Sequence, residues 1–434
     1  MKKLLTFLGT TNYVYVNYVL DNKKVESVRF VQQAIAEILC KDWSEKDKII
    51  VFLTEESRKK NWDDGYYIDE KGKPLKGLKT ELSSLGLKLK IEEEDIPEGK
   101  SEKELWELFK KVLHKIDKND EIYLDITHSF RSLPFLIMIA LNYAVNIKNA
   151  KIKGIYYGAI EALGTPQELK TMPNEERNAP IFNLVPFVTL FDWTIATRRF
   201  IDIGDASLLQ QLAQEELKPL LIKTGGKEGK ALKTFSDLLI KLSNSFATCR
   251  AREIPKIIYL IKEKINEVKE ELPILPAFLP LIEVIKEKLD KIKFNEKGLE
   301  ETLSTTEWCL EHNLIQQGFT LLQEGIITYY LKQIGLKEEE IANRDNRKVV
   351  VDAINCIVRN MPETDTLRIF PDKEKLHNII ISSSSIAELF TQISEYRNDL
   401  NHAGWTDNFH KPDDFKRKLG EFIQRLNKKE VQDV

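Results

Sequence analysis

The alternation of apolar and polar residues changes its character near residue 160. Before that point, short β-branched runs alternate with segments of helical period, which predicts an α/β domain built on a parallel sheet. The predicted strands span 3–8, 48–53, 87–91, 121–127 and 151–158. Because ligands bind outside the carboxyl ends of the strands in such sheets, the loops that begin at Gly9, Thr54, Thr127 and Gly158 form the predicted ligand-binding edge.

Helical periods lie between these strands and predominate in the rest of the chain. They lie at 28–39 and 105–116, and 133–147 is apolar nearly all round, as in a helix packed on the sheet. Residues 161–180 are polar and contain Gly, Pro and Asn, which indicates a linker or an excursion between domains. Further helical periods cover 187–202, 205–222, 231–248, 254–271, 277–292, 299–335, 346–360 and 384–402. The second half is therefore predicted to be all-α.

Composition narrows the classes of function. The 434 residues are 42% hydrophobic and 31% charged, which is typical of a folded multidomain protein, and the net charge of -3 provides no overall basic field for nucleic acid. Any RNA must therefore bind a local patch. The four cysteines stand far apart, which argues against a metal site and a disulfide framework. The apolar run 4–8 is too short for a signal peptide and no stretch approaches the length of a membrane span, so we expect a cytoplasmic protein.

The sharpest chemical signal is the string Arg397-Asn398-Asp399-Leu400-Asn401-His402 at the end of a helical pattern. On a continuous helix Asn398 and His402 lie one turn apart on the same face. A His can transfer protons when a 2'-hydroxyl attacks a phosphodiester, and an Arg can stabilise the charge on the phosphoryl oxygens. Asn398 could orient the imidazole or hold a phosphate oxygen. Alternatively, Arg397 and Asp399 are solvent-facing charges and His402 caps the helix.

A second polar string follows the predicted strand 121–127. It runs from Asp125 to Pro134 and offers hydroxyls, an imidazole and a guanidinium where a helix begins, which favours phosphate binding. The loop after the first strand, 8–13, adds backbone N–H groups, hydroxyls and the ring of Tyr13, which could stack on a base. Alternatively, His128 and Arg131 only satisfy carbonyls in a tight turn, and Gly9 only permits the turn.

Both strings resemble motifs of one family. The C-terminal string resembles the R-x(4-6)-H motif of the HEPN ribonuclease superfamily, and 313–330 is similar to the long helix beside that motif. The string at 124–134 resembles the D-x-T-H-G signature of CRISPR-associated CARF proteins, in which a Rossmann-like sensor of cyclic oligoadenylate is joined to a HEPN ribonuclease. The loop 8–13, this string, residues 154–159 and the C-terminal motif occur in the family's order and frame nearly the whole chain.

The resemblance implies a division of the chain and a set of site residues. It implies a CARF domain at 1–180, a helical linker domain at 181–295 and a HEPN domain at 296–434. The catalytic residues would be Arg397, Asn398 and His402. The residues that would bind cyclic oligoadenylate are Gly9, Thr10, Thr11, Asn12, Tyr13, Thr54, Thr127, His128, Ser129, Phe130, Arg131, Tyr157 and Gly158.

The resemblance also implies partners. The chain would form a homodimer or higher homo-oligomer and cut single-stranded RNA without a metal or other cofactor. A cyclic oligoadenylate would activate it, with tetra-adenylate favoured over hexa-adenylate. Two positions depart from the family's pattern: Ser129 replaces the Gly of the signature, and Thr11 stands where many relatives have a second Gly. Each adds a side chain near the activator's phosphates, which affects how closely the backbone approaches them.

Two other functions are compatible with a sensor domain. The chain could regulate transcription through a DNA-binding lobe within 190–290. The candidate DNA-binding residues are Arg250, Arg252, Lys256 and Lys262, whose positive charge is partly offset by Glu253 and Glu263. The sensor could also be an enzyme that opens its own cyclic ligand with Thr10, Thr11 or His128 nearby.

Overall fold

A computed structural model describes residues 1–128, 133–226, 228–271, 278–294, 298–407 and 409–430. The chain divides into two compact units, Met1–Thr189 and Leu190–Val434. None of the described helices is long and apolar enough to cross a membrane.

The first unit is built on one mixed sheet of eight strands. The strands are β1 (Lys2–Phe7), β2 (Val16–Leu20), β3 (Lys23–Val28), β4 (Lys48–Leu53), β5 (Lys90–Asp95), β6 (Glu121–Asp125), β7 (Lys151–Gly158) and β8 (Asn178–Asn183). They lie in the order β3-β2-β8-β7-β6-β1-β4-β5. The part from β7 to β5 is parallel throughout, whereas β8 is antiparallel to β7 and β3 is antiparallel to β2. The predicted parallel core is present, within a wider mixed sheet.

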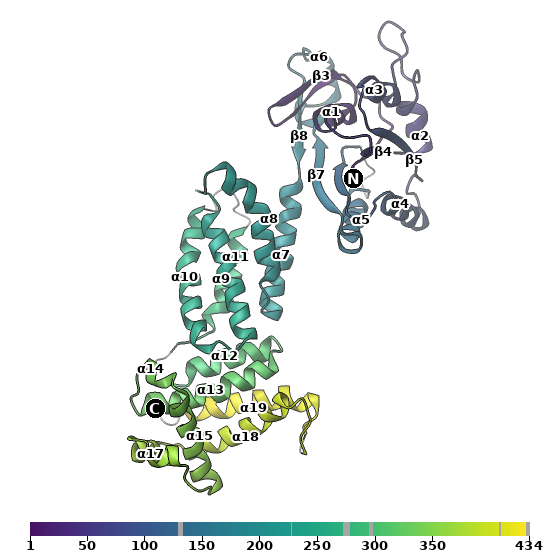
Figure 1. The fold of residues 1–434 in the computed structure, drawn as a ribbon. Helices are drawn as coiled ribbons and strands as arrows, with labels where there is room; N and C mark the ends of the chain where they lie inside the picture. Colours follow the sequence, from purple (N-terminus) through teal and green to yellow (C-terminus); the bar gives the residue numbers. More distant parts are fainter. Residues whose placement is uncertain (129–132, 227, 272–277, 295–297, 408, 431–434) are drawn as a thin grey trace. The chain divides into compact units, whose positions relative to one another are not determined.

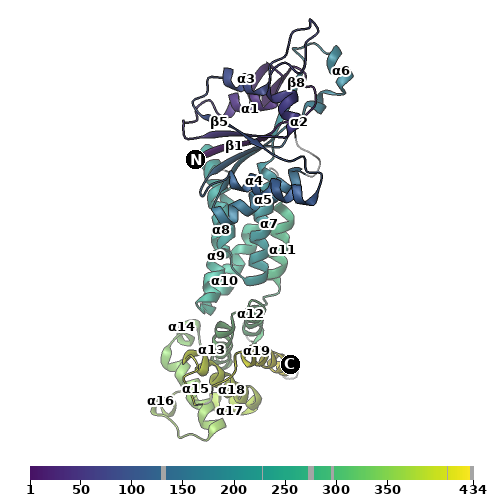
Figure 2. The ribbon, with the colours of Figure 1, turned by 90° about the vertical axis from the view of Figure 1, so that its right-hand side faces the viewer.

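Helices cover both faces of this sheet (Figures 1 and 2). One face packs Leu4, Ile49 and Val51 against α1 (Val31–Leu39) and α3 (Leu78–Ser84). The other packs Leu5 and Phe52 against α4 (Glu102–His114) and α5 (Leu133–Lys148). Alternate residues of the strands therefore serve two separate cores. The shorter elements are α2 (Glu55–Ser57), a π-helical turn (Arg58–Trp62), a 3₁₀ turn (Ile160–Leu163) and α6 (Pro166–Thr171).

Two predictions about this unit were wrong. Residues 161–180 are not an interdomain linker, because they contain α6 and lead into β8, which lies between β2 and β7 in the sheet. The predicted strand 87–91 is β5 at Lys90–Asp95, an acidic edge strand. Its carboxylates pair with cations, such as Glu92 with Lys48 at 2.8 Å. Because edge strands often carry charged residues, a search for apolar runs does not identify this strand correctly.

The second unit is helical. Its elements are α7 (Val185–Ile203), which begins in the first unit, then α8 (Ser207–Lys223), α9 (Lys230–Ala247), a 3₁₀ turn (Ala251–Glu253), α10 (Ile254–Glu271), α11 (Leu279–Asp290), α12 (Glu300–Glu311), α13 (Ile315–Gln333), α14 (Glu338–Ile341), α15 (Arg344–Arg359), α16 (Asp365–Arg368), α17 (Lys373–Ser382), α18 (Ser384–Asn401) and α19 (Pro412–Glu430). Helices α7 to α11 lie alongside one another (Figure 1) and share one core around Phe200, Leu239 and Ile258. A second core, around Phe319, Phe390 and Phe422, joins α13, α18 and α19.

The predicted continuous helix over 299–335 is wrong. Helix α12 ends at Glu311, and Asn313 has a φ of 59°, a left-handed conformation that stops a helix. His312 lies between the two helices with its ring buried, and its nitrogens contact the carbonyl oxygens of Trp308 at 2.7 Å and Ile201 at 3.1 Å. The break lets α13 turn and pack beside α12 as a separate helix.

Candidate functional site

The direction in which the parallel strands are added reverses at β1. The chain passes from β1 to β4 and β5 on one side and then places β6 and β7 on the other. The carboxyl ends of β1 and β6, where Thr6 pairs in register with Asp125, therefore flank the point at which ligands bind to such sheets. The loops that leave this point contain the predicted residues 9–13, Thr127 and His128.

Asp125 anchors this end of the sheet. Its buried carboxylate accepts hydrogen bonds from Thr6 Oγ1 at 2.6 Å, Thr127 Oγ1 at 2.6 Å and Thr127 N at 3.0 Å. Burial raises the pKa of Asp125, and the donors of Thr127 and Thr6 oppose that rise. The Thr127 hydroxyl also accepts from the N–H of Gly158 at 2.9 Å, which ties β6 to β7. The Asp and Thr of the string thus build the site, and the hydroxyl of Thr127 both donates and accepts a hydrogen bond within the sheet.

The loop after β1 is held through its carbonyl groups. Asn61, which is fully buried, donates to the carbonyl oxygens of Gly9 and Thr11, both at 2.9 Å. Tyr67 donates to the carbonyl of Thr10 at 3.1 Å. In the described part of the chain, nothing accepts a hydrogen bond from the backbone N–H groups of residues 10–12. A short loop with fixed carbonyls and free N–H groups is suited to binding an anion.

Arg29 holds the next part of this loop and links it to Asn61. Its guanidinium donates to the carbonyl of Tyr13 at 3.3 Å and to Asn61 Oδ1 at 3.1 Å. Arg29 is buried, and burial lowers its pKa. Sequence reasoning missed Arg29, Asn61 and Tyr67, because they lie outside any motif and reach the loop only through the tertiary fold.

The rings of Tyr13 and His128 contact each other. Their ring centroids lie 4.3 Å apart, and Tyr13 also meets Phe30 edge-on at 5.5 Å. Tyr13 is thus part of the core, which argues against the free stacking surface that the sequence suggested. Burial lowers the pKa of His128 to about 4, so its imidazole is neutral at pH 7, and burial raises the pKa of Tyr13.

One buried polar atom at this contact, His128 Nε2, has no hydrogen-bond partner among the described residues. Tyr13 Oη makes no hydrogen bond of good geometry, but the side chain of Thr11 and the backbone of Gly9 lie close enough to oppose the rise of its pKa. An unsatisfied buried atom such as His128 Nε2 is costly unless a ligand or water engages it. Gly9 leaves room for this arrangement, because a Cβ there would lie 2.4 Å from Tyr13 Oη and 3.3 Å from His128 Cβ.

The remaining predicted residues of the sensor have diverse environments. Thr54 is buried and caps α2, since Ser57 N donates to its hydroxyl at 3.2 Å. Tyr157 donates to Glu161, and a Cβ on Gly158 would lie 2.5 Å from Val31 Cγ2, so glycine permits the approach of α1. The predicted residues Ser129, Phe130 and Arg131 lie outside the described residues.

The C-terminal string lies in the last turn of α18. Asn398 and His402 are exposed, and the backbone N–H of His402 donates to the carbonyl of Asn398 at 2.9 Å. Arg397 is half-buried, and its Nε is buried without a hydrogen-bond partner in the part of the chain that the structure describes. The guanidinium lies near Cys249, where burial raises the thiol's pKa and the charges of Arg250 and Arg397 oppose the rise.

Helix α13 packs along α18, as the sequence suggested. The rings of Phe319 and Tyr396 stack with centroids 5.7 Å apart. At the N-terminal end of α13, Gln316 donates to Asn401 Oδ1 at 3.4 Å and Gln317 to the carbonyl of Ala247 at 3.3 Å. The start of α13 and the end of α9 therefore lie beside the last turn of α18.

Asp399 is not a solvent-facing charge, contrary to the alternative reading of the string. It is buried and accepts from His410 N at 2.6 Å and from His410 Nδ1 at 2.9 Å. Burial tends to raise the pKa of Asp399, but these hydrogen bonds and the nearby imidazole hold it below its usual value. The ring of His410 stacks on Tyr396 at 3.9 Å. Sequence reasoning missed His410, which fixes the segment after the motif.

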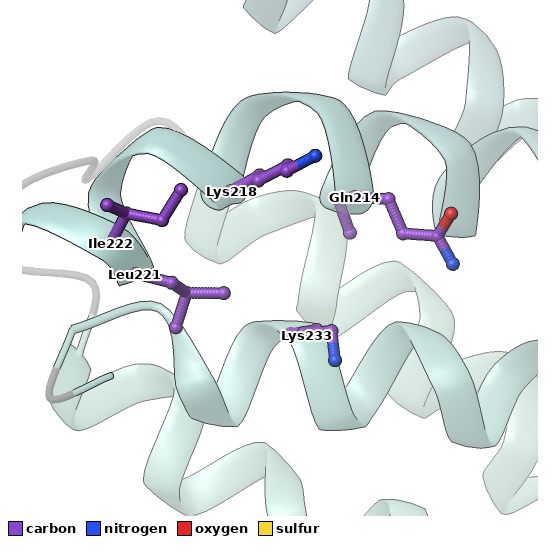
Figure 3. Close-up of a pocket in the computed structure, with 6 residues that line it drawn as sticks. Gln214, Lys218, Leu221, Ile222 and Lys233 are labelled. Carbon is purple, nitrogen blue, oxygen red and sulfur yellow. The ribbon is translucent and has the colours of Figure 1, made fainter. Parts of the chain in front are cut away.

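A cavity of about 440 Å³ lies between α8 and α9 (Figure 3). Its lining is Ala213, Gln214, Lys218, Leu221, Ile222 and Lys233. None of these is a predicted site residue, and Lys233 lies at the opposite end of α9 from Ala247, which borders the motif. In the described residues, no group of three or more His, Cys, Asp or Glu side chains could hold a metal ion.

Comparison with known proteins finds a family that matches most of the first unit. Residues 3–161 match the family described as CRISPR system endoribonuclease Csx1, CARF domain. A stretch of 244 residues is 28% identical to CRISPR-associated protein MJ1674 of Methanocaldococcus jannaschii and covers 56% of this chain. The match spans only 33% of that protein's own length. The family match includes β1, β6 and β7 with the loops of the candidate site, and we conclude that this chain is a CRISPR-associated protein with an N-terminal, Rossmann-like CARF domain.

Proposed function

We propose that this protein is an endoribonuclease that a cyclic oligoadenylate activates and that cleaves single-stranded RNA without a metal ion. The observation that carries the proposal is the Arg397-to-His402 turn, in which an exposed imidazole follows an Arg whose buried Nε has no partner among the described residues. The endoribonuclease in the name of the matching family supports it.

The groups of this turn suit attack by the 2'-hydroxyl. His402 can accept or donate the proton that moves between the sugar and leaving oxygens. Arg397 can bind the phosphoryl oxygens and stabilise their charge as the bond breaks. Asn398, one turn before His402, can orient the imidazole or hold a phosphate oxygen. One protomer supplies one such imidazole, whereas two copies would supply both an acid and a base.

An exposed apolar stripe on α5 supports a homodimer. Phe135, Ile139, Tyr143 and Ile147 recur every four residues on this helix, and all are exposed. Such a stripe is typical of an interface. A cyclic oligoadenylate with an even number of units can have a two-fold axis, so it suits a site to which two protomers contribute the same loops. We place the activator at the loops after β1 and β6.

One experiment tests the proposal. Labelled single-stranded RNA is incubated with the full chain in excess EDTA, with and without cyclic tetra- and hexa-adenylate. We expect cleavage only with activator, more with tetra-adenylate, and products with 2',3'-cyclic phosphate and 5'-hydroxyl ends. His114→Ala, which removes an exposed His from the end of α4, is the matched control and should cleave normally. Strict dependence on Mg²⁺, or 5'-phosphate products, would exclude this mechanism.

The same samples address the two other functions. A transcription factor would bind duplex DNA, but two of the four candidate cations are paired, Arg252 with Glu338 at 3.3 Å and Lys262 with Asp290 at 2.7 Å. A sensor that opens its own ligand would convert the activator to a linear product, which chromatography of the reaction would reveal. That activity is compatible with RNA cleavage.

A further inference from the structure

The segment between α18 and α19 exposes two large aromatic side chains. Trp405 is 91% exposed and Phe409 is 69% exposed, and Trp405 is the most exposed large apolar side chain in the described part of the chain. Burying such a side chain stabilises a protein by about 1.5–3 kcal/mol, so folding alone does not explain their exposure.

The segment is attached at both ends to the helix that bears the motif. Trp405 N donates to the carbonyl of His402 at 3.0 Å, and Gly404 N to the carbonyl of Asp399 at 3.1 Å. Gly404 has a φ of 77°, which turns the chain away from the axis of α18. At the other end, the bonds from His410 to Asp399 and its stacking on Tyr396 hold Phe409 close to the same turn. Both exposed rings therefore belong to a segment that begins directly after His402 and is tied back to the last turn of α18.

We propose that Trp405 and Phe409 stack on unpaired bases of the RNA close to the bond that is cut. This inference rests on the proposed function and adds the residues that select the substrate. Aromatic rings stack on any base whose face is free, so they favour single strands over duplexes and tolerate many sequences. The chain has a net charge of -3, so general attraction to phosphates is weak and stacking would supply much of the affinity.

Binding is measured in the His402→Ala background, so that the RNA stays intact. A fluorescent single-stranded RNA is titrated with this protein and with versions that also carry Trp405→Ala, Phe409→Ala or Trp405→Phe. We expect each Ala variant to raise Kd about 5- to 150-fold, the range for loss of one stacked base, and Trp405→Phe to retain most of the affinity. Tyr259→Ala removes another exposed aromatic ring of the same unit and should leave Kd unchanged.

The kinetic counterpart uses chains with His402 intact and saturating activator. Trp405→Ala and Phe409→Ala should raise KM by a similar factor, with kcat within a few-fold of the parent. An RNA of the same length without bases should bind all versions equally weakly.

Several outcomes would overturn the inference. If Trp405→Ala and Phe409→Ala leave both Kd and KM unchanged while the parent cuts RNA, the proposed function stands and the stacking role is wrong. Sedimentation could show that these variants dissociate into monomers with unchanged intrinsic RNA affinity, which would make the segment an interface between copies. A parent that neither binds nor cuts single-stranded RNA would remove both proposals together.

Discussion

His402 and Arg397 differ in burial, because His402 is exposed and Arg397 is half-buried. His402 is exposed at the end of α18, so replacing it should change cleavage without affecting folding. We expect His402→Ala and Arg397→Ala each to lower the single-turnover rate at saturating activator at least about a hundredfold. Arg397→Lys should also be impaired, because an ammonium cannot reproduce the planar fork of a guanidinium. Circular dichroism would check the fold, and full activity in a folded His402→Ala variant would move the active site elsewhere.

His128 predicts a pH dependence of stability. Its pKa is about 4 in the folded chain, against 6.5 ordinarily, because burial disfavours the charged form. Below pH 6.5 unfolding therefore takes up a proton, so this contribution is complete above about pH 6.5 and is lost as the pH falls toward 4. At about 1.4 kcal/mol per pH unit, the parent should lose roughly 3 kcal/mol relative to His128→Gln over that window.

Two measurements check this prediction. Urea unfolding of both full chains between pH 4 and pH 6.5 should show the parent losing free energy of unfolding relative to His128→Gln as the pH falls, and NMR titration should give the pKa of His128 directly. A constant difference across the window would mean that His128 titrates alike in the folded and unfolded chains.

At the scale of elements, glycines set how closely α13 approaches α12. A Cβ on Gly325 would lie 2.7 Å from Cβ of Thr302, a distance that rotation of the Thr side chain cannot relieve. Gly325→Ala should therefore destabilise the second unit by about 1–3 kcal/mol, despite alanine's better helix propensity. Gly420→Ala in α19 is the matched control. Its Cβ would meet only Leu310 Cδ2 at 3.5 Å, so we expect stabilisation by about 0.5–1 kcal/mol.

Thermal and urea unfolding of the two variants would measure both effects. We expect Gly325→Ala to lower the free energy of unfolding and Gly420→Ala to raise it. If Gly325→Ala were as stable as the parent, α12 and α13 would be able to separate without loss, and the close approach would not be needed for the fold.

At the scale of the whole molecule, activator binding and RNA cleavage should be separable. Arg131→Ala removes a predicted phosphate ligand, and loss of one charge-assisted contact should raise the Kd for cyclic tetra-adenylate about 10- to 100-fold. His402→Ala should abolish cleavage at every activator concentration while its activator Kd stays within a few-fold of the parent. Calorimetry with the activator and the RNA assay, applied to both variants, compare the two quantities. Unchanged activator affinity in Arg131→Ala would place the ligand away from residues 127–131.

The local pattern of apolar residues was enough to predict the strands in the buried part of the sheet. The strands predicted at 48–53 and 151–158 coincide with β4 and β7, and β4 is a continuous apolar run after its first residue, as central strands of a parallel sheet are. The same pattern missed β2, β3 and β8. These strands lie toward the mixed edge. β2 and β3 form a local hairpin with Asp21 and Asn22 as its turn, but polar residues interrupt their apolar runs, whereas β8 pairs with β2, a strand far along the chain, which no local period identifies.

The sequence by itself determined which strand ends carry polar groups and which helix end carries Arg397 and His402, because both follow from local periods and short motifs. Only the tertiary structure decided which of those groups remain free. It uses the hydroxyls of Thr54 and Thr127 for a helix cap and a strand bridge, and it clamps the loop after β1 with Arg29 and Asn61. Hydrogen bonds between residues far apart in the chain cannot be recognised from local spacing. Which donors and acceptors of a site remain unpaired is therefore decided only in the folded chain.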